Sequence, residues 1–155
     1  MGRLATLDDG QPQTTVRTAA VGDAADVAPL LEALGYPCTR DEAAERILVA
    51  LSDPRQQLLL AERDGHVCGL VALHTLYMIA NGADLARITA LVVDPTCHRQ
   101  GVGRRLLREA EAVARRTGAA RIEVTSGAQR TEARAFYCGC GYSDDSQRFV
   151  KLLGD

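Results

Sequence analysis

Tryptophan is absent from this 155-residue chain, and aromatic residues together make up only 4% of it. The core must therefore be built from Leu, Val, Ile and Ala, and little aromatic surface is available to stack on bases or sugars. The formal net charge of -2 also argues against nucleic acid as the main partner.

Targeting and membrane-spanning sequences are lacking as well. The N-terminus has neither a basic nor an apolar region typical of a signal peptide, and no apolar run approaches the roughly 18 residues of a membrane span. The five cysteines have no regular spacing, and the pair Cys138-Gly-Cys140 has no second pair at zinc-site spacing. We therefore predict a cytoplasmic protein with reduced thiols, without a metal and without a membrane partner.

The basic residues are concentrated in one stretch. Between His98 and Arg121 the sequence has seven Arg and only two acidic residues. A local basic region on a nearly neutral protein suits a small anionic ligand better than a long polyanion.

The remaining composition, 46% hydrophobic and 25% charged, is typical of one globular domain at this length. We expect a flexible polar tail over residues 1–13 and a single domain over residues 14–155. Apolar periodicity and turn signals predict strands at 14–20, 57–62, 67–77, 85–94, 121–125 and 148–153. They predict helices at 23–34, 103–117 and 132–138, and another that begins near Thr39 or Asp41 and ends before Asp53-Pro54. The apolar face expected for this last helix consists of Ala44, Ile47, Leu48 and Leu51. This order is typical of an α/β or α+β domain.

A glycine turn joins a predicted buried strand directly to a predicted helix, at Gln100-Gly101-Val102-Gly103. Glycine allows positive φ and a close approach of the backbone to a ligand. The first N–H groups of the helix have no intrahelical acceptor, and with the helix dipole they favour phosphate or pyrophosphate. The alternative interpretation is a tight strand-to-helix turn without a ligand.

Two nucleotide-binding motifs do not match this turn. A Walker A loop needs Lys and Ser/Thr after its last Gly, and Arg104 and Arg105 stand there instead. A dinucleotide fingerprint needs a small third residue where Leu106 stands, and Glu123 falls in the middle of a predicted strand, which is wrong for a ribose contact.

The segment His98-Arg99-Gln100-Gly101-Val102-Gly103 resembles the Gln/Arg-x-x-Gly-x-Gly/Ala motif of the GCN5-related N-acetyltransferase (GNAT) family, with His98 in place of the first Gln or Arg. A second segment, Ala133 to Tyr142, resembles the family's Ala-x-x-φ-Tyr-x-x-x-Gly-Phe/Tyr motif, where φ is apolar. The two motifs stand in the family's order at the family's spacing.

The resemblance implies the GNAT fold and acetyl-CoA as cosubstrate. That fold has a central mixed, mostly antiparallel sheet of about six to seven strands, flanked by about four helices and splayed between strands 4 and 5. By resemblance, backbone amides of the turn bind the coenzyme pyrophosphate and the strand before it pairs with the pantetheine arm. The residues implied in coenzyme binding are Leu91, Val92, Val93, His98, Arg99, Gln100, Gly101, Val102, Gly103, Arg104 and Arg130.

Family members place a Tyr at the position of Tyr137 as general acid, and a protonated phenol is suited to donate to a departing thiolate. The other interpretation of Tyr137 is a half-buried aromatic packed beside Phe136. Many relatives have a Glu base on the fourth strand, but residues 85–91 contain no acid. His74, Asp84 or a water molecule remain as candidates for the base.

The expected function is therefore transfer of an acetyl group to a primary amine of a small molecule, directly within a ternary complex. Glu32 and Tyr36 are candidates for shaping the acceptor pocket. A non-catalytic acyl-CoA sensor and a protein or peptide acetyltransferase are the alternatives. The last predicted strand could pair across a homodimer.

Overall fold

The computed structural model describes residues 13–125, 131–145 and 148–154. The predicted tail over residues 1–13, apart from its last residue, lies outside the described residues, as does Arg130. The chain divides into two compact units, residues 1–123 and residues 124–155, which are described separately below.

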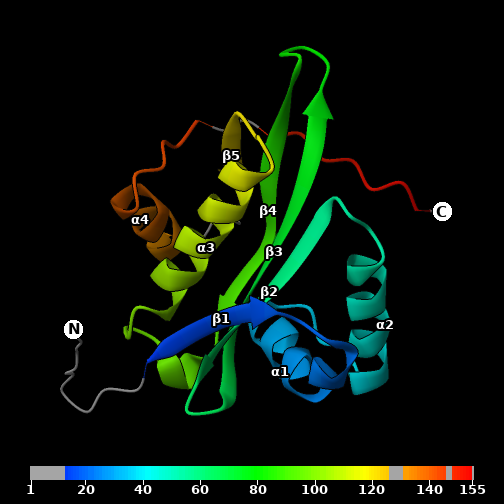
Figure 1. The fold of residues 1–155 in the computed structure, drawn as a ribbon, viewed down its shortest axis with the longest axis vertical. Helices are drawn as coiled ribbons and strands as arrows, with labels where there is room; N and C mark the ends of the chain where they lie inside the picture. The colour runs from blue at the N-terminus through cyan, green and yellow to red at the C-terminus, as the bar shows by residue number, and fades with distance from the viewer. Residues whose placement is uncertain (1–12, 126–130, 146–147, 155) are drawn as a thin grey trace. The chain divides into compact units, whose positions relative to one another are not determined.

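The first unit is built on the sheet, whose strands follow one another in sequence order (Figure 1). The strands are β1 (Thr14–Thr18), β2 (Gln56–Arg63), β3 (His66–Met78), β4 (Ala83–Val93) and β5 (Arg121–Val124). The first three pairings are antiparallel and the β4–β5 pairing is parallel. The predicted α+β class with a mixed, mostly antiparallel sheet is confirmed, with five strands in the described residues instead of six or seven.

The helices also match the predicted segments closely. They are α1 (Ala24–Leu34), which follows the 3-10 turn η2 (Val21–Asp23), α2 (Arg40–Leu51), α3 (Val102–Arg116) and α4 (Thr131–Gly139). The capping box at the start of α2 is present: Thr39 Oγ1 accepts the Glu42 N–H at 3.0 Å, and Glu42 Oε1 accepts the Thr39 N–H at 2.8 Å. These two bonds satisfy backbone donors that the helix itself cannot use, which explains why the helix begins there.

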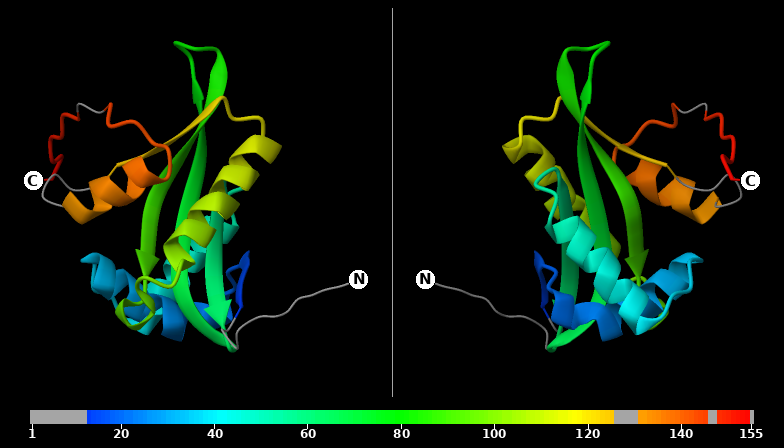
Figure 2. Two further views of the ribbon diagram at one scale, coloured as in Figure 1. Left: turned by 90° about the vertical axis from the view of Figure 1, so that its left-hand side faces the viewer. Right: turned by 90° about the vertical axis from the view of Figure 1, so that its right-hand side faces the viewer.

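One face of the sheet is covered by α3. Figure 2 shows α3 on one side of the sheet and α1 with α2 on the other. The buried side of α3 includes Leu106, which is fully buried. It packs over Gly69 on β3, where an added Cβ would lie only 2.9 Å from Leu106 Cδ1. The glycine therefore lets α3 approach the sheet closely, and this fixes the position of the helix start.

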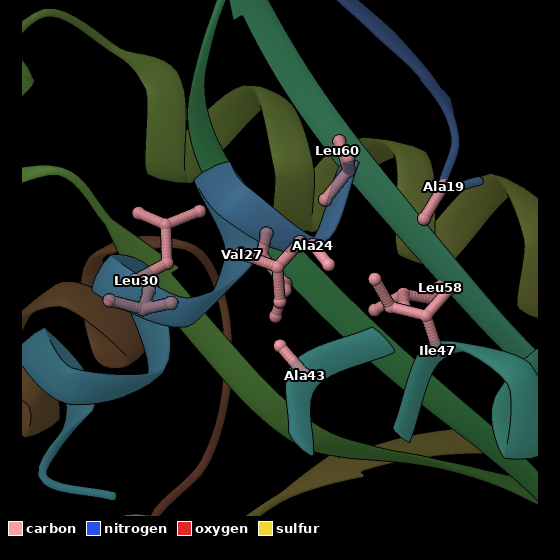
Figure 3. Close-up of a cluster of buried hydrophobic side chains, with 10 residues drawn as sticks. Ala19, Ala24, Val27, Leu30, Ala43, Ile47, Leu58 and Leu60 are labelled. Carbon is pink, nitrogen blue, oxygen red and sulfur yellow. The ribbon is translucent and has the colours of Figure 1, made fainter. Parts of the chain in front are cut away.

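The other face holds a cluster of aliphatic side chains (Figure 3). Val27 and Leu30 of α1, Ile47 of α2 and Leu60 of β2 are each at most 3% exposed. Leu48 and Leu51, which the helical pattern also assigned to the buried side of α2, are 55% and 43% exposed. Their exposure corrects that assignment, because the side of α2 that packs on the cluster is centred on Ala43 and Ile47, with Ala44 and Ala50 partly buried beside them.

The second unit contains α4 and the segment after it. The strand predicted at 148–153 is wrong: residues 148–154 have no regular secondary structure, and Phe149 and Leu153 are 93% and 90% exposed. An apolar, β-prone segment becomes a strand only when a neighbouring strand supplies its hydrogen bonds. Sequence pattern alone does not provide that neighbour.

Candidate functional site

The loop between β4 and α3 is held in place by side chains from both of its ends. It begins with the 3-10 turn η3 (Pro95–Cys97), where Asp94 Oδ1 accepts from the Thr96 N–H at 2.9 Å. The His98 ring pairs through Nε2 with the Val93 carbonyl at 3.1 Å, and Gln100 accepts from the Arg63 guanidinium. The side chain of His98 thus anchors the loop to the end of β4, a role that its place in the motif did not reveal.

The loop ends at Gly101, which precedes α3 with φ of 81°. Among the described residues no side chain caps the start of this helix, and its first turn contains no acidic residue. The first amides of α3 are therefore available to an anion, and the helix dipole adds positive potential there. Val102, the first residue of α3, is only 1% exposed, and its side chain packs toward Gly69 on β3.

Three arginines lie near this helix start, and they differ in whether their side chains are already paired within the protein. Arg99 and Arg104 are exposed, and Arg99 has a φ of 66°, an uncommon conformation for a residue with a Cβ. Arg105 points elsewhere: its Nη1 donates to the Thr14 carbonyl at 2.6 Å and its Nη2 pairs with Glu109 at 3.1 Å. Of these three cations, Arg99 and Arg104 remain as charges for a ligand at the loop.

The edge of β4 beyond β5 is the second part of the site. Ala72 on β3 pairs with Ala90 while Leu73 pairs with Ile88, so Thr89 is an extra residue in a β-bulge. Strand β5 lies along the other edge of β4, on the side away from β3. It begins beside Asp84 and ends at Val124, so it accompanies only the first half of β4. This arrangement fits the splay expected between strands 4 and 5, and it leaves the predicted Leu91–Val93 segment beyond the end of β5.

His74 lies on the face of the sheet that α1 and α2 cover, because side chains alternate along β3 and His74 is in step with Leu70 and Ala72, which pack in that cluster. Its register partners are Gln56 on β2 and Arg87 on β4. Asp84 alternates to the opposite face, where its carboxylate pairs with Arg55 Nη2 at 3.1 Å. Of the two side chains considered as a base, His74 is the nearer one to the bulge at Thr89, because it pairs with Arg87, whereas Asp84 pairs with Tyr77 further from the bulge.

An ion pair next to His74 was missed by sequence reasoning. Arg87 Nη2 on β4 pairs with Glu123 Oε1 on β5 at 3.3 Å, and Arg121 Nη2 pairs with Glu123 Oε2 at 3.0 Å. The side chains of Arg87 and Glu123 are 42% and 35% exposed. The two strands are far apart in sequence, so only their parallel pairing brings these residues together.

Tyr137 belongs to the second unit, on α4. Its ring makes an edge contact with Phe136 (centroids 5.2 Å apart) and a tilted contact with Tyr142 (5.8 Å). The Tyr142 N–H donates to the Tyr137 carbonyl at 3.0 Å, and Gly141 with φ of 95° permits that turn. Tyr137 and Tyr142, the two aromatic residues at fixed places in the second motif, thus form one aromatic cluster with Phe136.

The Cys68 thiol lies behind the loop and should be unreactive. Burial, and secondly the nearby Cys97 thiol, raise the pKa of Cys68 to about 11. At pH 8 only about one molecule in a thousand carries the reactive thiolate. We expect iodoacetamide to label exposed Cys138 at least about tenfold faster than Cys68, as followed by peptide mass spectrometry. Equal labelling rates would show that Cys68 is not buried.

Within the described residues, no group of three or more His, Cys, Asp or Glu side chains is arranged to hold a metal ion. None of the described helices has both the length and the apolar character to cross a membrane. The described residues of the first unit instead offer a helix start for an anion, the part of β4 that extends beyond the end of β5, and a charged cluster on β4 and β5 with the His74 imidazole on neighbouring β3.

Comparisons with known proteins agree on one family. The sequence model described as the Acetyltransferase (GNAT) family matches residues 25–142. The aminoalkylphosphonate N-acetyltransferase of Salmonella typhimurium is 32% identical, over 94% of this chain and 96% of that protein. The aminoglycoside N(6')-acetyltransferase type 1 of Stenotrophomonas maltophilia is 29% identical, over 88% of this chain and 90% of that protein. A GNAT family acetyltransferase structure from Staphylococcus aureus superimposes with a TM-score of 0.78 at 24% identity, covering 90% of this chain and 98% of that one, which supports the fold.

Proposed function

Because the chain belongs to the GNAT family of acetyltransferases and is an N-acetyltransferase, we propose that it moves the acetyl group of acetyl-CoA directly to a primary amine of a small molecule. The observation that carries this proposal is the start of α3 after Gly101, which has no side-chain cap and is joined by a short loop to the bulged strand β4. No covalent enzyme intermediate is needed, because the amine and the thioester meet in one ternary complex.

The coenzyme would be held by the loop and the strand edge together. The amides of Val102, Gly103 and Arg104 would bind the pyrophosphate, with Arg99 and Arg104 as nearby cations. Gln100 and His98 would keep the loop in this conformation through their contacts with Arg63 and Val93. The pantetheine arm would pair with the backbone of Leu91–Val93, and Arg130 remains proposed as a partner of a coenzyme phosphate.

The chemistry needs an unprotonated amine, a stabilised oxyanion and a proton for the leaving thiolate. Acetyl-CoA supplies the thioester carbonyl that the amine nitrogen attacks, and the C–S bond then breaks. The amide near Leu91 would donate to the oxyanion, and the Tyr137 hydroxyl would protonate the sulfur. His74 would take the proton from the amine, directly or through water, since it lies on the face of β3 next to the bulged half of β4.

The acceptor proposed from similarity is a small-molecule amine, since two relatives carry names of enzymes that acetylate aminoalkylphosphonates and aminoglycosides. Glu32 and Tyr36, both exposed near the end of α1, are proposed to contribute to the acceptor pocket. The five cysteines are free thiols, which is consistent with the reducing cytoplasm that we propose as the compartment.

Replacing Gly101 by Ala should weaken acetyl-CoA binding about tenfold, as measured by isothermal titration calorimetry. The φ of 81° strains any residue with a Cβ by roughly 1–2 kcal/mol, and the new methyl group lies on the loop that binds the coenzyme. Gly118→Ala is a matched control, because Gly118 has φ of 83° and equally open space but follows the far end of α3. The control should lose the same stability and bind acetyl-CoA normally.

Two results would contradict the proposal. If both variants bind acetyl-CoA as the unchanged protein does, the α3 start is not the coenzyme site. If acetyl-CoA binds but no amine in a broad panel releases free thiol from it, the protein is an acyl-CoA sensor instead of an enzyme.

A further inference from the structure

The Arg87–Glu123 ion pair lies further along β4 than the proposed coenzyme site. Arg87 stands two residues before the bulge residue Thr89, and Leu91–Val93 stand after it. A strand advances by about 3.3 Å per residue, so Val93 and Thr89 are roughly 13 Å apart along β4. An extended arm anchored at the loop and paired with this edge therefore brings its reactive end toward the bulge, and a substrate that meets it there lies close to Arg87.

The charges of this cluster do not balance. Two guanidinium groups, Arg87 and Arg121, share the single carboxylate of Glu123. Arg87 engages that carboxylate through Nη2, one of its three guanidinium nitrogens, at 3.3 Å. Among the described residues the cluster thus has one positive charge in excess at a half-exposed position, where an anion from solution can enter.

The hydrogen bonds of Glu123 indicate that Arg87, and not Glu123, would bind the substrate. Each carboxylate oxygen of Glu123 accepts from a guanidinium, so Glu123 is suited to hold Arg87 in place. Arg87 is planar, permanently charged and able to form two parallel hydrogen bonds to a carboxylate, phosphate or phosphonate. His74, its register partner on β3, lies on the same side of the sheet.

We propose that Arg87, positioned by Glu123, binds an acidic group of the acceptor, so that the substrate is a small amine that also carries a phosphonate, phosphate or carboxylate. The acidic group would be held beside β4 while the amine, at the other end of the acceptor, points toward the thioester. This inference rests on the proposed function, since it describes the acceptor side of the same site.

The test compares acceptors that differ in the acidic group: 2-aminoethylphosphonate, O-phosphoethanolamine, β-alanine and neutral propylamine, each with acetyl-CoA in a thiol-release assay. The unchanged protein should prefer at least one acidic amine over propylamine by about tenfold or more in kcat/KM. Among the acidic amines, the ranking distinguishes a phosphonate, phosphate or carboxylate ligand. Arg87→Gln should lower the ratio of acidic to neutral kcat/KM by about tenfold, mainly through KM, and Arg87→Lys should restore part of it.

Arg55→Gln is the matched control. It breaks a similar ion pair, Arg55–Asp84 at 3.1 Å, on the opposite face of the same sheet, and should leave the acidic-to-neutral ratio unchanged. A preference of the unchanged protein for propylamine, or an equal fall in both kcat/KM values in Arg87→Gln, would overturn the inference while leaving the acetyltransferase proposal standing. Absence of thiol release with every amine tested would instead overturn the proposed function, and the inference with it.

Discussion

Replacing Tyr137 by Phe is expected to lower kcat by about a hundredfold or more while changing the Kd for acetyl-CoA less than about twofold. A positioned general acid typically contributes 10²- to 10⁴-fold, roughly 3–5 kcal/mol of barrier. The substitution removes only the hydroxyl, so the ring contacts with Phe136 and Tyr142 at 5.2 Å and 5.8 Å are retained. Steady-state thiol release and calorimetric binding of acetyl-CoA measure the two quantities separately.

Tyr142→Phe is the control for this prediction, because it removes a hydroxyl from the same aromatic cluster. It should keep kcat within about threefold of the original value, since our proposal gives that hydroxyl no part in proton transfer. If Tyr137→Phe turns over as fast as the unchanged protein, Tyr137 is a packing residue beside Phe136 and the thiolate is protonated by another donor.

Asp23→Ala should lower the free energy of unfolding by about 3 kcal/mol, the largest stability effect expected among the described charged residues. Asp23 is 9% exposed, and its carboxylate accepts from Arg17 Nη1 and Nη2 at 2.9 and 2.8 Å and from the Ala20 N–H at 2.7 Å. Removing it leaves the Arg17 guanidinium with Glu62 and the Thr18 carbonyl, and takes away the side-chain acceptor of the Ala20 N–H at the start of η2. Urea denaturation followed by circular dichroism measures the change.

The same carboxylate predicts a pH dependence. Hydrogen bonds from Arg17 in the first place, and from the Ala20 N–H, hold the pKa of Asp23 below its usual value in the folded protein. A lowered pKa stabilises the fold fully above the unfolded value of about 4, and this contribution is lost as the pH falls through the folded value. The stability difference between the unchanged protein and Asp23→Ala should therefore shrink below about pH 4.

Asp26→Ala serves as control, because Asp26 lies in the first turn of the same helix but is exposed. It should change the free energy of unfolding by less than about 0.5 kcal/mol. A comparable loss in both variants would mean that helix-end charge, and not the contact with Arg17, accounts for the effect of Asp23.

Local signals in the sequence were sufficient for most of the fold. The capping box Thr39–Glu42 begins α2 because its two hydrogen bonds form within four residues, and Gly35 ends α1 with φ of 110°. The turn at Gly101 could be predicted for the same reason: a residue that needs positive φ before a helix is a local requirement.

Where the prediction was wrong or incomplete, the missing information was a neighbour distant in sequence. The segment 148–153 has a strand-like composition, yet the structure gives it no regular secondary structure. Leu48 and Leu51 fit a helical apolar stripe, yet the packing of α2 against the sheet leaves them exposed. Both outcomes depend on which partner surface is available, and a periodic pattern does not contain that information.

The sequence by itself determined the family, the order of the elements from β1 to α4 and the glycine turn that begins α3, because motif residues, caps and turns act over a few positions. Only the tertiary structure decided that His98 anchors the loop to Val93, that Arg105 turns toward Thr14, and that Arg87 meets Glu123. The last of these pairs joins residues 36 positions apart. Such contacts depend on the register and direction of whole strands, which hydrogen bonding across the sheet fixes and local sequence does not.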